Sequence, residues 1–205
     1  SLIRKVADTN MPILLIGETG SGKDLIATEI HKASGRKNKN FVAVNCADIS
    51  EANLELKLFG REQDYAPTAS PERGSSEIGL LALAHKGTLF LDGVAALPIN
   101  LQAKLLRLIE DGNFSPIGSN KKISSDVRLI SSADTSLDIA SREGVLREDF
   151  RFRLDVINIS VPPLRDRGED ILPLFQIFLE KALGHRDINK TEIDVLLIDC
   201  LRYYK

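Results

Sequence analysis

The residues of this chain with the clearest chemical potential form a glycine-rich segment that ends in a lysine and an aspartate. The segment reads Gly17-Glu18-Thr19-Gly20-Ser21-Gly22-Lys23-Asp24. Its glycines allow a turn to present consecutive backbone N–H groups to an anion, and Lys23 adds a positive charge beside them. This combination is typical of a loop that binds the phosphates of a nucleotide. The alternative, a flexible glycine-rich connector, would not explain the regular patterns on its two sides.

Those flanking patterns indicate a strand before the segment and a helix after it. Four branched apolar residues, Ile13 to Ile16, suit a buried parallel strand. Leu25, Ile26 and Ile30 follow at helical spacing, which places a helix N-terminus beneath the same anion. One position departs from the usual pattern, because Asp24 stands where a serine or threonine commonly places its hydroxyl on Mg²⁺.

Two further strand patterns deliver polar side chains to the same edge of the predicted sheet. The pattern from Gly87 to Asp92 ends in a carboxylate. P-loop nucleotidases hold magnesium with an acid at this place, so Asp92 is the expected Mg²⁺ ligand. The pattern from Phe41 to Val44 is followed by Asn45, and ligand-binding groups gather at the carboxyl ends of strands in open α/β sheets. An aspartate that only caps a strand and an asparagine that only stabilises a turn are the alternatives.

The composition fits a globular α/β chain. Its 205 residues are 43% hydrophobic and 27% charged, enough to bury a core and to hold one α/β domain with a small appendage. The net charge of −2 gives the chain no overall basic character, so this segment is not expected to contact nucleic acid directly, and local basic patches stay open as the alternative. Cys46 and Cys200 lack metal-ligand spacing and are expected to be reduced, which favours a cytosolic protein. We expect no membrane span and no signal peptide, since the apolar runs are only as long as strands and Ser1 to Lys5 does not open a signal peptide.

The remaining patterns predict how the chain is divided. Residues 63–76, rich in Pro, Ser and Gly, are expected to form a long exposed loop, and residues 35–40 a solvated basic loop. Pro162-Pro163 stops the sheet, so residues 1–162 should form the α/β subdomain and residues 163–205 the start of a small helical one. Helices are expected at residues 2–8, 51–59, 80–84, from Leu101 to Asp111-Gly112, and near 171–179, and strands at 127–131 and 156–161.

The order of these motifs resembles the AAA+ domain of bacterial enhancer-binding proteins, the NtrC-type activators of sigma-54 RNA polymerase. The resemblance implies a P-loop AAA+ fold, with a parallel five-stranded sheet flanked by helices and a C-terminal helical lid that is partly truncated here. It also implies binding of ATP or ADP with Mg²⁺, a cytoplasmic location, and self-assembly into a dimer or ring. The family's phosphate loop usually carries glutamate where Asp24 stands. Segments in family order include Phe41 to Cys46, Leu58 to Gly60, Gly87 to Asp92, Val127 to Ile130, Arg147 to Asp149, Arg153-Leu154 and Pro162 to Ile171.

Several departures from the family pattern concern catalysis. Gly93 follows Asp92 where the family has a glutamate that polarises the attacking water, so we expect no intact catalytic side chain. Losing a positioned general base costs about 10²–10⁴ in rate. Asn45 matches the residue that restrains this glutamate in the family, and it has no glutamate to restrain here. The family's Ala-Thr-Asn is replaced by Ser132-Ala133-Asp134, which removes a polar reader of the γ-phosphate.

Other family elements concern partners. Arg147 and Arg153 fit the family's trans-acting arginines, which reach a neighbouring subunit's nucleotide, although surface arginines on a helix are the alternative. The family's sigma-54 contact loop, Gly-Ala-Phe-Thr-Gly-Ala, is replaced by Asp64 to Ala69, which lacks the contact residues. Pro67 and Pro71 also restrict the movement of this loop. DNA contacts are expected from a domain outside these residues.

Three functions remain open on this evidence. The favoured one is the nucleotide-binding central module of a DNA-binding transcriptional regulator, with impaired ATP hydrolysis and no need for sigma-54. The second is an active ATPase that drives open-complex formation by sigma-54 polymerase. The third is an assembly module controlled by cyclic di-GMP, as in degenerate, VpsR-like relatives, with Arg4, Arg36 and Lys37 as candidate ligand contacts.

Overall fold

A computed structural model describes residues 2–62 and 77–183. The chain divides into two compact units, residues 1–161 and residues 162–205. In the second unit, the short 3-10 helix η2 (Leu164–Asp166) precedes the helix α8 (Gly168–Leu183). The first unit holds the sheet and the candidate site.

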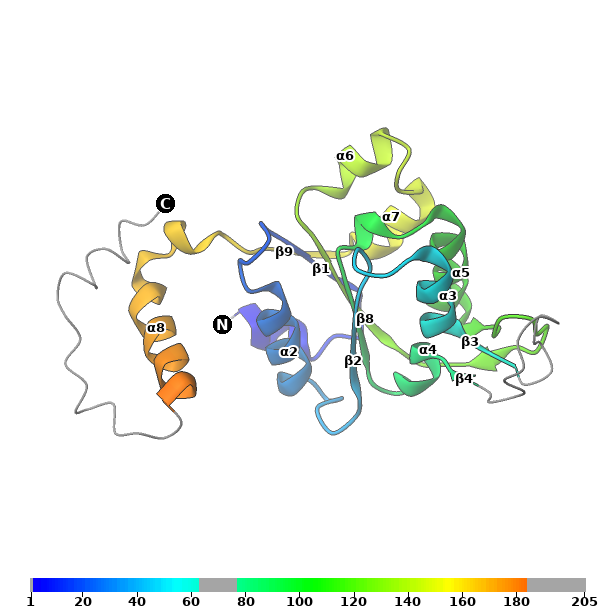
Figure 1. Ribbon diagram of the computed structural model, residues 1–205, viewed down its shortest axis with the longest axis horizontal. Coiled ribbons are helices and arrows are strands. Elements are labelled where there is room, and N and C mark those ends of the chain that lie inside the picture. The colour runs from blue at the N-terminus through cyan, green and yellow to red at the C-terminus, as the bar shows by residue number, and fades with distance from the viewer. Residues whose placement is uncertain (1, 63–76, 184–205) are drawn as a thin grey trace. The chain divides into compact units, whose positions relative to one another are not determined.

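A parallel five-stranded sheet forms the centre of the first unit (Figure 1). The strands lie in the order β2-β5-β8-β1-β9, so β8 separates β1 from β5. The register pairs Ile16 with Ala133 and Asn45 with Asp92, which brings the carboxyl ends of these strands to one edge. The strand bounds are β1 (Ile13–Ile16), β2 (Phe41–Asn45), β5 (Thr88–Asp92), β8 (Arg128–Ala133) and β9 (Ile157–Ser160).

Helices cover both faces of this sheet. On one face, α1 (Leu2–Ala7) and α2 (Lys23–Ala33) pack Val6, Ala27 and Ile30 against Ile13 and Phe90. The opposite face is covered by α3 (Glu51–Phe59), α4 (Leu80–Leu83), the 3-10 helix η1 (Val94–Ala96), α5 (Ile99–Asp111), α6 (Leu137–Arg142) and α7 (Glu148–Leu154).

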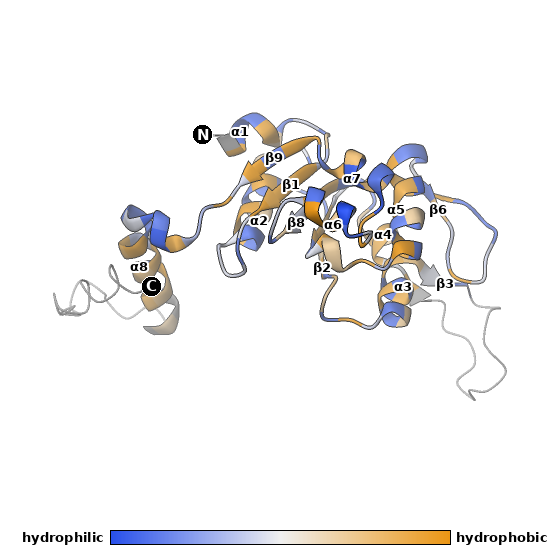
Figure 2. Ribbon diagram, turned by 90° about the horizontal axis from the view of Figure 1, so that it is seen from above, coloured by the Kyte–Doolittle hydropathy of each residue, from blue (hydrophilic) through white to orange (hydrophobic). Residues whose placement is uncertain are grey.

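Strand β1 is apolar on both faces, as a strand between two helical layers requires. Neighbouring residues of β1 alternate between the two hydrophobic clusters, since Ile13 and Leu15 join one and Leu14 joins the other. Figure 2 shows β1 largely in the colour of hydrophobic residues. The predicted fold class is therefore confirmed.

The observed elements differ from the predicted ones mainly at their ends and in short segments. Strand β8 continues to Ala133, two residues beyond the predicted end, and places its last residues beside β1. Two small antiparallel pairs, β3 (Gly60–Arg61) with β4 (Glu77–Ile78) and β6 (Asn113–Phe114) with β7 (Ile123–Ser124), were not predicted, because two-residue strands carry no periodic pattern.

Some predictions concern residues that the structure does not describe. The expected loop at 63–76, with the sigma-54 contact position, lies outside the described residues, as does Cys200. Cys46 is a buried free thiol, and burial together with the charge of Asp92 raises its pKa to about 12. None of the helices in residues 2–62 and 77–183 has both the length and the apolarity needed to cross a bilayer.

Candidate nucleotide-binding site

A pocket of about 440 Å³ lies at the carboxyl edge of the sheet. The loop between β1 and α2 forms one side of it, and the ends of β2, β5 and β8 form the other. Most of the predicted phosphate-loop residues therefore meet Asn45, Asp92 and Gly93 in one place. The residues that line the pocket are Thr19, Gly20, Gly22, Lys23, Asp24, Asn45, Ala47, Asp92, Gly93 and Asp134.

The backbone of the loop has the shape that its glycines predict. Gly20 and Gly22 adopt left-handed conformations, with φ of 83° and 95°, which few other residues adopt without strain. A Cβ on Gly17 would lie 2.4 Å from the carbonyl oxygen of Val161, so no side chain fits there. Gly22 is the N-cap of α2 and has no side chain to cap the helix. The N-terminus of α2 can therefore direct its N–H groups and its partial positive charge towards an anion.

The Lys23 side chain is only 7% exposed, and its ammonium group has three partners. Nζ donates to the carbonyl oxygens of Gly17 and Glu18, at 2.6 and 3.1 Å. It also donates to Oδ1 of Asp134, at 2.8 Å. An ammonium group carries three hydrogens, so each of them has a partner in this structure.

Asp134 lies over the phosphate loop, a contact that the sequence did not predict. Besides its ion pair with Lys23, its Oδ2 accepts a hydrogen bond from Oγ1 of Thr19, at 3.1 Å. The hydrogen bond from Lys23 is the main reason that the pKa of Asp134 is lowered below its usual value. Asp134 therefore carries its negative charge at neutral pH. Only tertiary pairing of β8 with β1 brings this residue to the loop, since 111 positions separate it from Lys23.

Two other carboxylates, those of Asp24 and Asp92, line the same pocket. Burial raises the pKa of Asp24, the charge of Asp92 raises it further, and Lys23 opposes this increase. A cation near both carboxylates would relieve their repulsion, and Mg²⁺ prefers such oxygen ligands. In the described part of the chain, no three His, Cys, Asp or Glu residues come together to hold a metal by themselves. The residues thus fit a Mg²⁺ ion that shares its coordination with bound phosphates, which is the common arrangement for this metal.

The residue that follows Asp92 in the chain is Gly93, so no glutamate side chain is present at that position. Gly93 has a left-handed backbone with φ of 67°, and it contributes only backbone to the pocket. Asn45 forms a local turn, because its Oδ1 accepts a hydrogen bond from the N–H of Ala47 at 2.9 Å. Asn45 thus makes the contact expected of an asparagine that stabilises a turn, which is the alternative given by the sequence.

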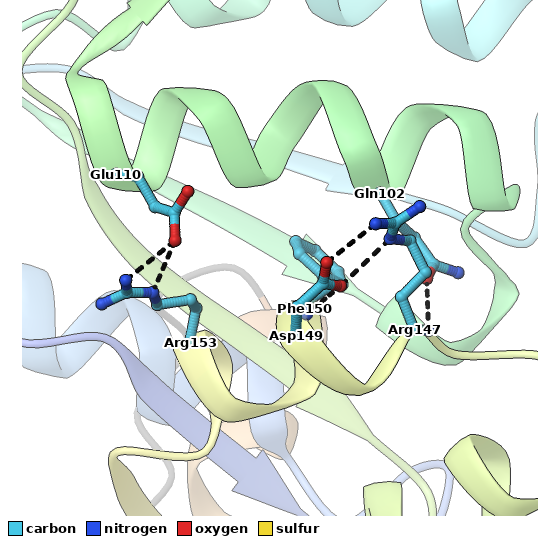
Figure 3. Close-up of polar contacts among 6 residues, drawn as sticks. All are labelled: Gln102, Glu110, Arg147, Asp149, Phe150 and Arg153. Carbon is cyan, nitrogen blue, oxygen red and sulfur yellow. Dashed lines mark hydrogen bonds and ion pairs between the residues drawn. The ribbon is translucent and has the colours of Figure 1, made fainter.

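Arg147 and Arg153 lie outside the pocket and are bound to acids of their own chain (Figure 3). Nε and Nη2 of Arg147 donate to the carboxylate of Asp149, at 3.0 and 2.7 Å. Arg153 donates through Nε and Nη2 to Oε1 of Glu110, at 3.0 and 2.8 Å. Their side chains are 41% and 56% exposed. Because each arginine is paired with an acid, it would have to release that acid to reach a neighbouring subunit's nucleotide.

Arg36, one of the candidate ligand contacts, lies away from the candidate pocket. Its Nη2 pairs with Oδ1 of Asp126 at 2.7 Å, and its Nη1 donates to the carbonyl oxygen of Gly87 at 3.1 Å. Both partners precede strands, so Arg36 lies at the amino edge of the sheet, opposite the loop. The reason is the length of α2, whose 11 residues carry the chain about 16 Å from the loop. Arg4 and Lys37 are exposed and are absent from the residues lining the pocket.

Comparison with known proteins finds similar sequences among transcriptional regulators. SfnR of Pseudomonas fluorescens, a sigma-54-dependent transcriptional regulator, is 42% identical over 178 residues, which cover 87% of this chain and 47% of SfnR. The HTH-type transcriptional regulatory protein TyrR of Haemophilus influenzae is 42% identical over 191 residues, 93% of this chain and 57% of TyrR. The chain thus spans about half the length of these relatives.

A solved structure is similar to this chain along nearly its whole length. NtrX from Brucella abortus in complex with ADP has a TM-score of 0.86 and 37% identity, over 98% of this chain and 43% of that one. Its complex with ATP has a TM-score of 0.85. The family model of the sigma-54 interaction domain matches residues 1–160. The chain therefore belongs to the sigma-54 interaction domain family, the AAA+ domain of NtrC-type transcriptional regulators.

Proposed function

We propose that this chain is the nucleotide-binding central module of a DNA-binding transcriptional regulator, and that it hydrolyses ATP slowly. The observation that carries the proposal is the pocket in which Lys23, Asp24 and Asp92 surround the open N-terminus of α2. The complexes of NtrX with ADP and with ATP support the choice of ligand.

Each part of the pocket has a distinct role in this proposal. The loop N–H groups of residues 17–24 and the ammonium group of Lys23 bind the phosphates. Asp92 and Asp24 hold Mg²⁺, which when bound neutralises charge on the terminal phosphates. No residue is assigned to activate the attacking water, because Gly93 offers no side chain there. This absence is our reason to expect slow hydrolysis.

Assembly and partners complete the proposal. Residues 1–162 act as the nucleotide-binding subdomain and residues 163–205 as the start of the helical lid. Arg147 and Arg153 act at a contact between copies of the protein, after exchanging their acids for a neighbour's nucleotide. DNA is bound by a domain outside these residues. The regulator acts on RNA polymerase without sigma-54, because Ala66 and Pro67 stand where the tip of the family's contact loop has its aromatic and hydroxyl side chains.

Calorimetric titration of the complete protein with Mg-ADP, Mg-ATP and cyclic di-GMP tests the ligand. We expect binding of the first two and loss of both in Lys23→Ala. Lys32→Ala is the matched control, since Lys32 lies on the same helix but pairs with Glu29 at the surface. Equal nucleotide affinity in Lys23→Ala and the wild type would contradict the site, and binding of cyclic di-GMP alone would favour the assembly module.

Two assays test the output. A phosphate-release assay on the assembled protein should give turnover well below about 1 s⁻¹, the low end for working enzymes. Transcription in vitro with purified polymerases should show regulation without the sigma-54 enzyme. Open complexes that form only with that enzyme and hydrolysable ATP would instead identify an active sigma-54 ATPase.

A further inference from the structure

Asp134 occupies a central place in the candidate pocket. Strand β8 lies between β1, which leads into the phosphate loop, and β5, which ends at Asp92. The N–H of Gly17 donates to the carbonyl oxygen of Ala133 at 3.1 Å, which fixes the end of β8 against the start of the loop. Asp134 follows directly, and the ion pair with Lys23 places its carboxylate on the loop itself.

The charges that line the pocket disfavour a highly charged anion. Among the described lining residues, Lys23 is the one cation, against the carboxylates of Asp24, Asp92 and Asp134. Magnesium can compensate Asp24 and Asp92, since both fit its coordination. Asp134 differs from them because its carboxylate is bound to the lysine and to Thr19. Its charge therefore acts on whatever approaches Lys23.

The contacts of Lys23 show what a phosphate would have to displace. Two of its hydrogens bind carbonyl oxygens of the loop and hold the loop in shape. The third binds Asp134, whose side chain is 62% exposed and is also held by Thr19. A phosphate oxygen therefore gains the lysine at the expense of Asp134. After this exchange the carboxylate stays next to the bound phosphates.

We propose that Asp134 makes this site select a nucleoside diphosphate over a triphosphate. The inference rests on the proposed nucleotide site. A loop lysine of this kind reaches the β- and γ-phosphates, and Asp92 is the expected ligand of a metal that would neutralise the charge of these groups. A γ-phosphate would thus lie between Lys23 and Asp92, where the strand order places Asp134. A diphosphate lacks the γ-phosphate, so the Asp134 carboxylate repels it less.

The test is the ratio of two affinities in the complete protein. Calorimetry with Mg-ADP and with a Mg-bound, non-hydrolysable ATP analogue should show tighter binding of the diphosphate in the wild type. Asp134→Asn removes the charge and keeps the size, and it should strengthen triphosphate binding about tenfold more than diphosphate binding. Asp111→Asn is the control, because it makes the same change at an exposed residue that is not among those lining this pocket.

The outcomes separate this inference from the proposed function. A shift in the ratio in Asp134→Asn alone supports the inference. Binding of both nucleotides with a ratio that Asp134→Asn leaves unchanged, or that Asp111→Asn shifts equally, overturns it while the nucleotide site stands. Binding of neither nucleotide by the wild type overturns both. Asp134→Ser provides a second variant if the asparagine protein fails to fold, and the same shift is expected.

Discussion

Ser132 holds the carboxylate of Asp92 across two neighbouring strands. The hydroxyl of Ser132 donates to Oδ1 of Asp92 and accepts a hydrogen bond from the N–H of Gly93, at 2.9 Å for the second contact. Strand β8 therefore positions both the expected magnesium ligand of β5 and the turn that follows it. A side chain on one strand fixes the geometry of the site on the next.

Ser132→Ala should weaken the magnesium-dependent part of nucleotide binding. The variant leaves the Asp92 carboxylate without its donor and costs about 1 kcal/mol of stability, the typical contribution of one hydrogen bond. We expect a loss of a few-fold in Mg-ADP affinity, measured by calorimetry at several magnesium concentrations. Ser131→Ala serves as the control, because its buried hydroxyl contacts Ile13 at 3.4 Å on the same strand. Equal effects of the two variants would count against a positioning role for Ser132.

Gly93→Glu should raise ATP turnover and lower stability. Nothing lies within 4 Å of a Cβ at this position, so a glutamate side chain has room. The left-handed backbone at φ of 67° is strained for any other residue, by about 1–2 kcal/mol. Gly93→Ala carries the same strain without a carboxylate. A phosphate-release assay should therefore show faster hydrolysis in the glutamate variant only, and an equal rate in both would refute the assigned cause of slow turnover.

Acidification should destabilise the fold through His31. This buried histidine contacts Oγ1 of Thr88 through Nδ1, at 2.9 Å, and its ring lies beside Phe41. Burial lowers its pKa, the charge of Arg128 lowers it further, and a hydrogen bond with the backbone of Lys39 opposes both. The folded state thus binds a proton at His31 less readily than the unfolded chain does. The stabilisation of the fold by neutral His31 is therefore complete above about pH 6.5 and decreases as the pH falls below this value.

Urea unfolding at pH 7.5 and pH 5.5 measures this effect. The free energy of unfolding should decrease more between these values in the wild type than in His31→Gln. Carboxylates contribute the same background to both proteins. An equal pH dependence would show that His31 is not the responsible group.

Arg128→Met should release helix α1 from the sheet. The arginine is 1% exposed, and its Nη1 and Nη2 donate to the carbonyl oxygens of Ala7 and Val6, at 2.7 Å each. These carbonyls lie at the end of α1, and removing their donors costs about 1–3 kcal/mol for buried polar groups. Hydrogen exchange of residues 2–7 should become faster. Arg107→Met is the control, since it makes the same change outside this contact, and unchanged exchange in Arg128→Met would contradict the role of Arg128.

The five strands of the central sheet and the phosphate loop could be predicted from the sequence, because their signals are local. Ile13 to Ile16 shows its burial in its own composition, and Gly20 and Gly22 have the left-handed backbones that a phosphate loop requires. Asp92 was found in the same way, as an acid at the end of an apolar strand. The phosphate- and metal-binding roles of these residues stay predictions.

The contacts of Asp134, Ser132 and Arg36 could not be predicted in the same way. Each joins segments that only the strand order brings together, such as β8 with the phosphate loop. The sequence does not show that Arg36 lies at the edge of the sheet opposite the phosphate loop, because its nearness to Lys23 along the chain hides the length of α2. The turn contact of Asn45 was one of the two alternatives that the sequence left open, since asparagine commonly accepts a hydrogen bond from the N–H two residues later.

The hydrogen bonds from Lys23 to the carbonyl oxygens of Gly17 and Glu18 affect the rate at which nucleotides bind. These two hydrogen bonds hold the lysine against the loop, so association needs no slow ordering of the backbone. An exposed carboxylate such as that of Asp134 turns within picoseconds to nanoseconds, which is faster than nucleotides arrive. The charge of Asp134 should therefore act mainly after arrival, by shortening the residence time of a triphosphate, while the association rates of the two nucleotides stay similar.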